Sequence, residues 1–154
     1  MGITAQDLMQ KDLTVLLKDD LVIDAVEMFY IHKVIGLPVI EGDWYLIGFI
    51  SESDILKATL PTYLEAITSS AFLSKEGESI FFDKIRDIGL KRVEEFMTKE
   101  VIYVDPTASL ISVADLMIRK RIKRLPVVEN ERFVGIIDRS AFYEFLMEGG
   151  LLNE

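Results

Sequence analysis

The sequence predicts a mixed α/β (α+β) fold made of two copies of one unit, with a helical insertion between them. The first observation is an internal repeat, because the chain matches itself at a shift of 88 residues and, beyond one turn, at a shift of 87. The second is that each copy alternates short apolar strands with helical segments in the order β-α-β-β-α. The third is size: one such unit is too small to bury both of its faces alone, so the two copies should pack together.

The internal repeat rests on anchors that keep the same order in both halves. In the first stretch, the aligned pairs are Met9 with Met97, Lys11 with Lys99, and Leu37-Pro38-Val39 with Leu125-Pro126-Val127. After the turn, the aligned pairs are Gly48 with Gly135, Ile50 with Ile137, and Ser53 with Ser140. A shared order of elements, rather than scattered matches, indicates two copies of one unit.

The first copy can be assigned element by element. Residues 13–15 favour a short strand, and residues 20–33 have helical composition with Asp19 and Asp20 as candidate caps. The apolar runs 37–40 and 45–50 flank a Glu41-Gly42-Asp43 turn and predict a hairpin. A second helix is expected over residues 51–58.

The second copy follows the same order. Residues 101–104 favour a strand, and residues 109–123 favour a helix with Thr107 and Ser109 as candidate caps. Val127-Val128, a turn at Asn130-Glu131, and residues 133–137 predict the hairpin. The final helix is expected over residues 139–147.

A segment with its own pattern separates the copies. Pro61 should end the preceding helix, residues 63–72 and 79–90 favour helices, and residues 74–78 form a polar turn. The aromatic residues of this segment predict a packed insertion rather than a flexible linker; they are Tyr63, Phe72, Phe81 and Phe82. The predicted division is therefore residues 1–59 for the first repeat, 60–92 for the insertion and 93–154 for the second repeat.

Composition excludes several classes of function. A net charge of −9 and a pI near 4.7 argue against general nucleic-acid binding, which needs a basic face. The absence of cysteine excludes a disulfide framework and a thiolate zinc site, and the single His32 excludes a site built on two imidazoles. No signal peptide and no apolar run of about 20 residues is visible, so we expect a cytoplasmic protein without membrane insertion. No catalytic set and no metal cluster stands out, which favours a protein that is not an enzyme.

The repeated Leu-Pro-Val, Gly-φ-φ-Ser and Asp features, where φ is an apolar residue, resemble the cystathionine β-synthase (CBS) domain. Two copies in tandem resemble a CBS pair, or Bateman module. The resemblance implies a disc with a pseudo-twofold axis, in which clefts between the repeats bind AMP, ADP, ATP or related adenosyl ligands. It also implies a regulatory module that signals to a separate partner protein.

The resemblance carries one ligand site onto this chain. Ser51-Glu52-Ser53-Asp54 fits the family's Ser/Thr-x-x-Asp motif, in which a carboxylate accepts hydrogen bonds from the ribose hydroxyls. Ser51 at a helix start, among unpaired backbone N–H groups, suits a phosphate, and apolar side chains suit an adenine slot. The expected ligand-binding residues are Phe49, Ser51, Ser53, Asp54, Val101, Ile102, Arg121, Ile122, Lys123, Arg124 and Pro126.

A basic cluster at residues 119–124 adds to this expectation. It carries five cations in six positions on an acidic chain, and a local cluster can hold a phosphate because distant charges are screened. Two alternatives stay open. The cluster can be a solvated helix end whose cations complement the dipole, and Ser51 with Asp54 can simply cap a helix.

A second, weaker site is expected in the other cleft, where residues of the first repeat combine with the motif of the second. Its residues are Thr14, Val34, Ile35, Gly36, Pro38 and Arg139. It departs from the family pattern in the motif Asp138-Arg139-Ser140-Ala141. Ala141 stands where the ribose-binding carboxylate is expected, and Asp138 should repel a phosphate. Arg139 could offset that charge.

The main helix of each repeat is apolar most of the way round, which requires two buried sides. One side packs on the unit's own strands, and a second subunit is the natural cover for the other, so we expect a homodimer through these helices. The alternative to a nucleotide-binding module is a dimerisation scaffold with degenerate ligand sites.

Overall fold

Two separate cores organise the structure, a computed structural model that describes residues 2–66 and 75–150. The repeat-1 unit comprises Val15–Glu41 and Ile47–Glu100, and the repeat-2 unit comprises Met1–Thr14, Gly42–Leu46 and Val101–Glu154. Each unit therefore contains the segment that begins the other repeat in the sequence. The mixed α/β fold class predicted from the sequence is confirmed.

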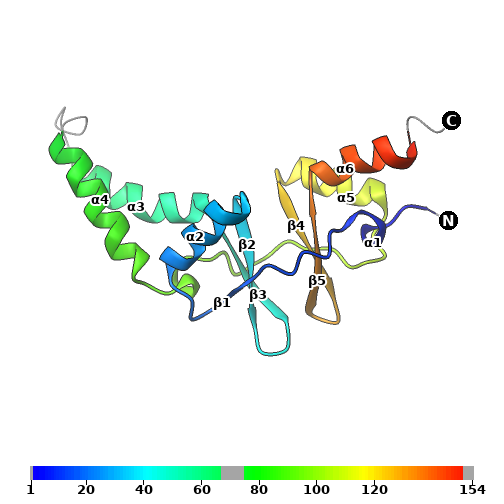
Figure 1. Ribbon diagram of the computed structural model, residues 1–154, viewed down its shortest axis with the longest axis horizontal. Helices are drawn as coiled ribbons and strands as arrows, with labels where there is room; N and C mark the ends of the chain where they lie inside the picture. The colour runs from blue at the N-terminus through cyan, green and yellow to red at the C-terminus, as the bar shows by residue number, and fades with distance from the viewer. Residues whose placement is uncertain (1, 67–74, 151–154) are drawn as a thin grey trace. The chain divides into compact units, whose positions relative to one another are not determined.

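In the repeat-1 unit, three neighbouring strands lie beside a group of helices (Figure 1). The strands are β1 (Leu16–Leu17), β2 (Gly36–Glu41) and β3 (Tyr45–Ser51), and the helices are α2 (Val22–His32), α3 (Glu52–Ala66), α4 (Lys75–Gly89) and the 3-10 turn η2 (Val93–Glu95). β1 pairs in parallel with β2, with Leu16 opposite Val39. Buried apolar side chains from strands and helices alike, among them Leu37 and Ile50, form the core.

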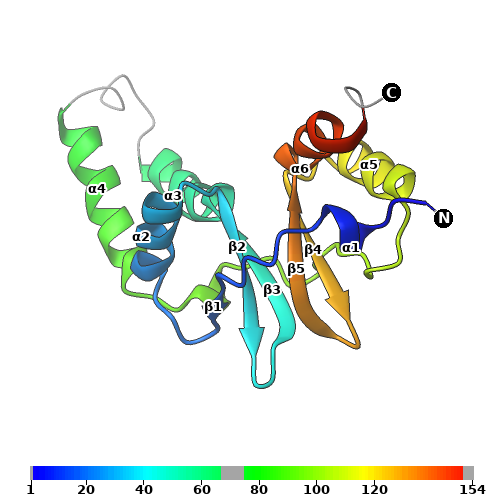
Figure 2. The same ribbon diagram turned by 45° about the vertical axis from the view of Figure 1, so that its right-hand side comes forward.

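In the repeat-2 unit, a hairpin takes the place of the three strands (Figure 2). Its elements are α1 (Ala5–Leu8), α5 (Leu110–Arg119), β4 (Arg124–Glu129), β5 (Arg132–Asp138), α6 (Ser140–Phe145) and the π-helix η3 (Leu146–Gly150). β4 and β5 are antiparallel, with Leu125 opposite Ile137. Asn130 and Glu131 have φ values of 52° and 67°, which is the backbone of a tight two-residue hairpin turn and agrees with the predicted turn.

The segment that begins each repeat closes the core of the unit in which it packs. Thr98 exchanges two backbone hydrogen bonds with Phe49, at N···O distances of 2.8 and 3.0 Å. Gln10 and Ile136 exchange the matching pair at 2.8 and 3.1 Å. These two pairings occupy aligned positions of the two repeats, so the structure reproduces the internal repeat.

Two predicted strands are wrong in position or extent. The strand expected at residues 13–15 begins at Leu16 instead, because the Thr14 N–H and hydroxyl both donate to Asp12 Oδ1, at 3.1 and 2.6 Å. This local turn withdraws Thr14 from strand pairing. In the second copy, only Val104 of residues 101–104 forms a bridge, to Val127, because the Asp105–Thr107 turn follows at once.

The predicted helix caps have mixed outcomes. Ser109 caps α5 and its Oγ accepts from the Ser112 N–H at 3.1 Å, as expected. Asp19 and Asp20 do not cap α2. The Leu21 N–H before this helix donates instead to Asp24 Oδ2 at 2.9 Å. Asp20 instead accepts from the Leu17 N–H. Thr107 belongs to the turn before Ser109, because its N–H and hydroxyl are both bonded to Asp105.

The insertion differs from its predicted outline. α3 continues through Pro61 to Ala66, so the prediction that Pro61 ends this helix is wrong. A proline removes one N–H donor from a helix, and it can kink the helix without ending it. The expected polar turn at 74–78 is also wrong from residue 75 onward, because α4 begins at Lys75. Ser74, Phe72 and the rest of residues 67–74 lie outside the described residues, as does the Tyr63 side chain.

α4 belongs to the repeat-1 core rather than to a linker. Its Ile88 is 2% exposed and packs in the cluster that contains Val22 and Ile55. A Cβ built on Gly89 lies 3.6 Å from Ile23 Cβ, so the end of α4 rests on α2. α3 and α4 lie side by side in both ribbon views. Among the described residues, no helix is long and apolar enough to cross a membrane.

If α4 completes this core, Ile88→Ala should lower the free energy of unfolding by about 2–5 kcal/mol, because it leaves a cavity among apolar side chains. Ile80 on the same helix is 42% exposed and provides the matched control, with an expected change of about 0.5 kcal/mol or less. Urea denaturation of both variants measures the difference. Equal losses would show that α4 does not depend on this burial.

Candidate functional site

The start of α3 holds the predicted Ser51 and Asp54 in one reciprocal hydrogen-bond network. The Ser51 N–H donates to Asp54 Oδ2 at 2.9 Å, and the Ser51 hydroxyl lies 3.2 Å from the same oxygen. The Asp54 N–H donates back to Ser51 Oγ at 3.2 Å. This is a capping box, so the helix-cap interpretation of these two residues is correct, and a ligand role would have to coexist with it.

Asp54 has a further partner that the sequence did not indicate. The Thr98 hydroxyl donates to Asp54 Oδ1 at 3.3 Å, across 44 positions of the chain. Thr98 stands between Met97 and Lys99, which are two anchors of the internal repeat, and that placement was the available signal. Both Asp54 oxygens therefore accept hydrogen bonds within the repeat-1 unit.

The phosphate expectation at Ser51 needs one correction. It assumed unpaired backbone N–H groups in the first turn of α3. The Glu52 N–H donates to the Ile35 carbonyl at 2.9 Å, and the Asp54 N–H is taken by Ser51. Ser53 is exposed on this turn. The helix start therefore offers less backbone capacity for an anion than its position suggests.

Phe49 lies against Gly36, although the two residues were predicted for different sites. A Cβ on Gly36 would lie 2.6 Å from Phe49 Cε1 and 3.0 Å from the Ile50 carbonyl oxygen, so only glycine leaves room for the ring. In the second repeat, Arg124 and Ile136 stand at the aligned positions. The repeat-1 unit thus gathers Phe49, Ser51 and Asp54 near Ile35 and Gly36.

The repeat-2 unit holds the remaining residues of the first predicted site. Ile102 is exposed and Val101 half-buried, and neither lies in a strand. The chain turns sharply after α5, with Arg121 at φ 54°, and the Ile122 N–H donates to the Met117 carbonyl at 2.9 Å. Pro126 is buried in β4, which agrees with a structural role.

The basic cluster separates into cations with different surroundings. Arg119 closes the last turn of α5 and forms an ion pair with Asp115, which agrees with the helix-end interpretation for this residue. Arg124 is half-buried, and burial lowers the pKa of its guanidinium, against the opposing effect of Asp138 and Asp12. The three remaining cations are exposed to solvent; they are Lys120, Arg121 and Lys123.

The second predicted site has a different chemistry at its motif. Ala141, at the position aligned with Asp54, is buried and provides no carboxylate. The Ser140 hydroxyl donates to Asp138 Oδ1 at 2.5 Å, and Arg124 is the strand partner of Asp138. Arg124 is therefore a cation close to the Asp138 charge. Thr14 is tied to Asp12, and Arg139 precedes α6 without a side-chain cap bond.

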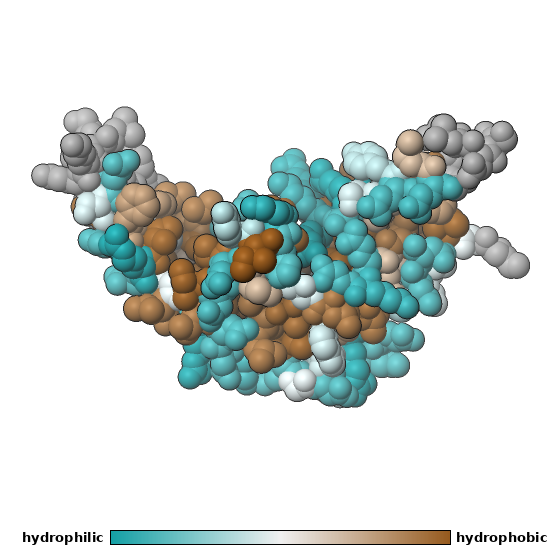
Figure 3. Space-filling view, viewed as in Figure 1, coloured by the Kyte–Doolittle hydropathy of each residue, from teal (hydrophilic) through white to brown (hydrophobic). Residues whose placement is uncertain are grey.

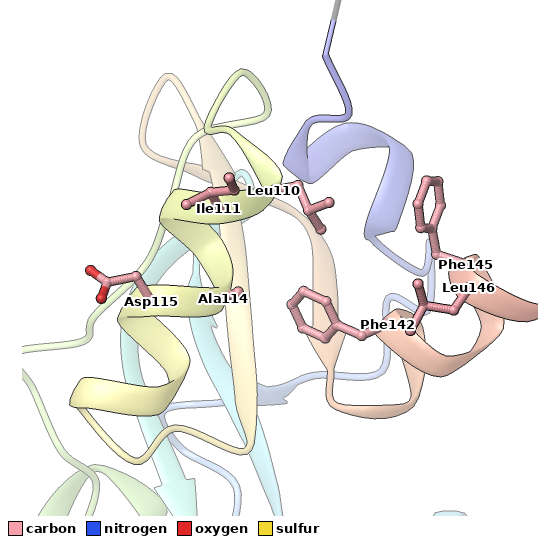
Figure 4. Close-up of a pocket in the computed structure, with 7 residues that line it drawn as sticks. All are labelled: Leu110, Ile111, Ala114, Asp115, Phe142, Phe145 and Leu146. Atoms are coloured by element: carbon pink, nitrogen blue, oxygen red, sulfur yellow. The ribbon is translucent and has the colours of Figure 1, made fainter. Parts of the chain in front are cut away.

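An apolar groove lies between α5 and α6 in the repeat-2 unit. It has a volume of about 380 Å³ and is lined by Leu110, Ile111, Ala114, Asp115, Phe142, Phe145 and Leu146. Figure 4 shows the Phe142 ring between the two helices, whereas Asp115 points away from it. Ile111 and Ile118 on α5 are 78% and 75% exposed, which is unusual for two isoleucines on one helix.

The aligned region of the repeat-1 unit is filled. Leu110 and Phe142 correspond to Val22 and Ile55, which are buried together with Ile88 of α4. Leu146 is 40% exposed, whereas its counterpart Thr59 is fully buried. Apolar side chains do remain at the surface over α2 and α4, as Figure 3 shows. The insertion thus packs on the residues aligned with Leu110 and Phe142, whereas Ile23, aligned with Ile111, is 51% exposed.

Among the described residues, no group of three or more His, Cys, Asp or Glu side chains could hold a metal ion. Of the expected ligand residues, Asp54 is a half-buried carboxylate of the repeat-1 unit, and Arg121 and Lys123 are exposed cations of the repeat-2 unit.

The comparisons with known proteins point to one family. The model of the CBS domain matches twice, over residues 5–60 and 93–148. A protein of Methanocaldococcus jannaschii, MJ1426, is 33% identical over 153 residues, which cover 92% of this chain and 90% of that protein. A second protein of that organism, MJ1225, is 28% identical, and the match covers 92% of this chain but only 42% of the relative.

Solved structures agree with this result. The CBS-pair protein CBSX2 from Arabidopsis thaliana is 29% identical, with a TM-score of 0.74 and a coverage of 96% for each chain. A structure of CBSX2 in complex with AMP is 28% identical, with a TM-score of 0.69, and covers 95% of this chain and 97% of that chain. The matched family model is not that of a catalytic domain.

The capping role of Asp54 is testable apart from any ligand. Asp54→Ala should lower the free energy of unfolding by about 1 kcal/mol, because the first turn of α3 loses its side-chain acceptor. Asp24→Ala removes the equivalent bond at α2 and should cost a similar amount. Chemical denaturation without ligand measures both. A loss confined to Asp24→Ala would contradict a capping function for Asp54.

Proposed function

The chain belongs to the CBS domain family, and on that premise we propose that it is a regulatory module that binds an adenine nucleotide and signals to a separate partner protein. The observation that carries this proposal is the network of Ser51, Asp54 and Thr98, which holds a carboxylate in one orientation at a helix start. Support also comes from CBSX2, a relative that was solved in complex with AMP.

The chemistry of the nucleotide suits the proposed residues. A ribose diol has two O–H donors, and the half-buried Asp54 carboxylate is an acceptor for them. The exposed cations Arg121 and Lys123 can neutralise phosphate charge on a chain whose net charge is −9. The apolar and backbone contacts to adenine would come from Phe49, Val101, Ile102, Ile122 and Pro126, with Ser53 and Arg124 completing the set.

The second set of residues is proposed as a weaker site. Thr14, Val34, Ile35, Gly36, Pro38 and Arg139 keep the family's positions, but no carboxylate occupies position 141. The charge of Asp138 opposes a phosphate, and Arg124 reduces that effect. A ligand there would lack the acceptor for its ribose hydroxyls.

Regulation follows only if the nucleotide binds two states of the module with different affinity. A difference of about 1–3 kcal/mol between the states changes their ratio by roughly 5- to 150-fold. The partner that reads this change is proposed to be a separate protein.

We also propose that the module is a homodimer and that a second copy covers the α5–α6 groove. Ile111 and Ile118 are exposed, and the half-buried Phe142 ring lines the groove beside them, which makes this surface apolar. In the repeat-1 unit, Ile88 of α4 packs with Val22 and Ile55, but Ile23 and Tyr30, which align with Ile111 and Ile118, are 51% and 73% exposed. The dimer is therefore proposed through both main helices, α2 and α5, with the α5–α6 groove as part of the contact.

Ligand binding by the wild type and two aspartate variants tests the nucleotide proposal. AMP should bind the wild type, and Asp54→Ala should weaken it by about 1–3 kcal/mol, because the ribose hydroxyls lose their acceptor. Asp24→Ala loses a comparable cap and should bind AMP unchanged. Calorimetry with AMP, ADP, ATP and S-adenosylmethionine, with GTP as the control, identifies the ligand class. A wild type that binds none of them would favour the scaffold function.

Light scattering tests the dimer. The wild type should have the mass of a dimer at micromolar concentration, and Ile118→Asp should have that of a monomer, because a charge cannot be buried in the apolar contact. Leu90→Asp changes another exposed apolar residue, on the repeat-1 unit, and should remain dimeric. A monomeric wild type would contradict the proposal.

A further inference from the structure

We infer that Thr98 is a positioning residue for the ligand: its hydroxyl orients the Asp54 carboxylate so that one acceptor position on Oδ1 is directed to a ribose hydroxyl. The inference rests on the proposed function, since it concerns the same carboxylate. It goes beyond that function by naming a residue outside the family motif and the atom through which it acts.

The hydrogen bonds that Asp54 accepts within the chain leave one acceptor position of its carboxylate for a ligand. A carboxylate has about four acceptor positions, two on each oxygen. Oδ2 receives the Ser51 N–H at 2.9 Å and faces the Ser51 hydroxyl at 3.2 Å. Oδ1 receives the Thr98 hydroxyl at 3.3 Å. Within the described part of the chain, the position that remains is therefore on Oδ1, the oxygen that Thr98 contacts.

The torsion of a terminal carboxylate is broad, and turning the planar group about its last bond moves both oxygens together. The Thr98 bond at Oδ1 therefore adds to the Ser51 bonds at Oδ2 in restricting this rotation. An acceptor fixed before the ligand arrives loses less conformational entropy on binding.

Thr98 is itself held in place. Its N–H donates to the Phe49 carbonyl at 2.8 Å, and its carbonyl accepts from the Phe49 N–H at 3.0 Å. A β-branched side chain has few χ1 rotamers, so a fixed backbone also fixes the hydroxyl. Phe49 is another expected ligand residue, and the two bonds tie Thr98 to it.

The second repeat shows whether the hydroxyl at this position is needed for backbone pairing alone. Gln10 takes the aligned position and keeps the same two backbone bonds, with Ile136, at 2.8 and 3.1 Å. The chain therefore does not need a threonine hydroxyl to pair the segment with its strand. Ala141 replaces the carboxylate in that repeat. The hydroxyl is present in the repeat that has the carboxylate and absent in the repeat that lacks it.

The test compares AMP with 2′,3′-dideoxyadenosine monophosphate, which lacks the ribose diol, by calorimetry on the full chain. Thr98→Val should weaken AMP about 3- to 10-fold, the effect of one hydrogen bond. It should leave the dideoxy nucleotide within about twofold of the wild type, because no hydroxyl is present to meet Asp54. Thr98→Ser keeps the donor and should restore AMP binding. If Thr98→Val does not fold, Thr98→Ala is used in its place.

Thr107→Val provides the matched control, because it removes another threonine-to-aspartate hydrogen bond, to Asp105, and should not change either affinity. Equal weakening of both nucleotides by Thr98→Val, or unchanged AMP binding, would overturn the positioning role while the loss in Asp54→Ala upholds the proposed function. A wild type that does not bind AMP would overturn both.

Discussion

Both cores depend on the short segment that begins one repeat in the sequence and packs in the unit of the other. Two backbone hydrogen bonds seat each segment on a strand, between Thr98 and Phe49 in one unit and between Gln10 and Ile136 in the other. A methionine from each segment lies over a glycine of the strand, where a Cβ on Gly48 or Gly135 would collide with the sulfur. Neither core is complete without these residues. The backbone pairing of Thr98 with Phe49 also places the Thr98 hydroxyl beside Asp54.

The two repeats share this backbone pairing but differ in the side chains at neighbouring aligned positions. In the first repeat, Gly36 leaves room for the Phe49 ring. In the second repeat, Arg124 and Ile136 stand at these two positions, so a cation is present and the aromatic ring is absent. The exchange places a cation beside Asp138, whose charge would otherwise stand alone near the second motif. At these positions the repeat-1 unit therefore has a carboxylate and a ring, whereas the repeat-2 unit has a cation.

The insertion makes the units unequal in a second respect. α4 buries Ile88 between α2 and α3, so the apolar faces of these helices are partly satisfied within the chain. The helices α5 and α6 align with α2 and α3 in the internal repeat, and Ile111 and Ile118 on α5 are exposed. An apolar helix face needs a partner on both sides. The insertion therefore makes the apolar surfaces of the two units unequal.

The sequence alone determined the order helix-strand-strand-helix in each repeat, the turn at Asn130-Glu131 and the Ser109 cap, because each depends on residues within a few positions of one another. The repeated motifs also indicated the family, since their order recurs in both halves. The ligand residues remain predictions. Only the tertiary structure decided that α3 continues past Pro61, that α4 joins a core, and that Thr98 meets Asp54. A contact between side chains 44 positions apart leaves no periodicity or spacing in the chain, so folding has to bring the two groups together before it can be seen.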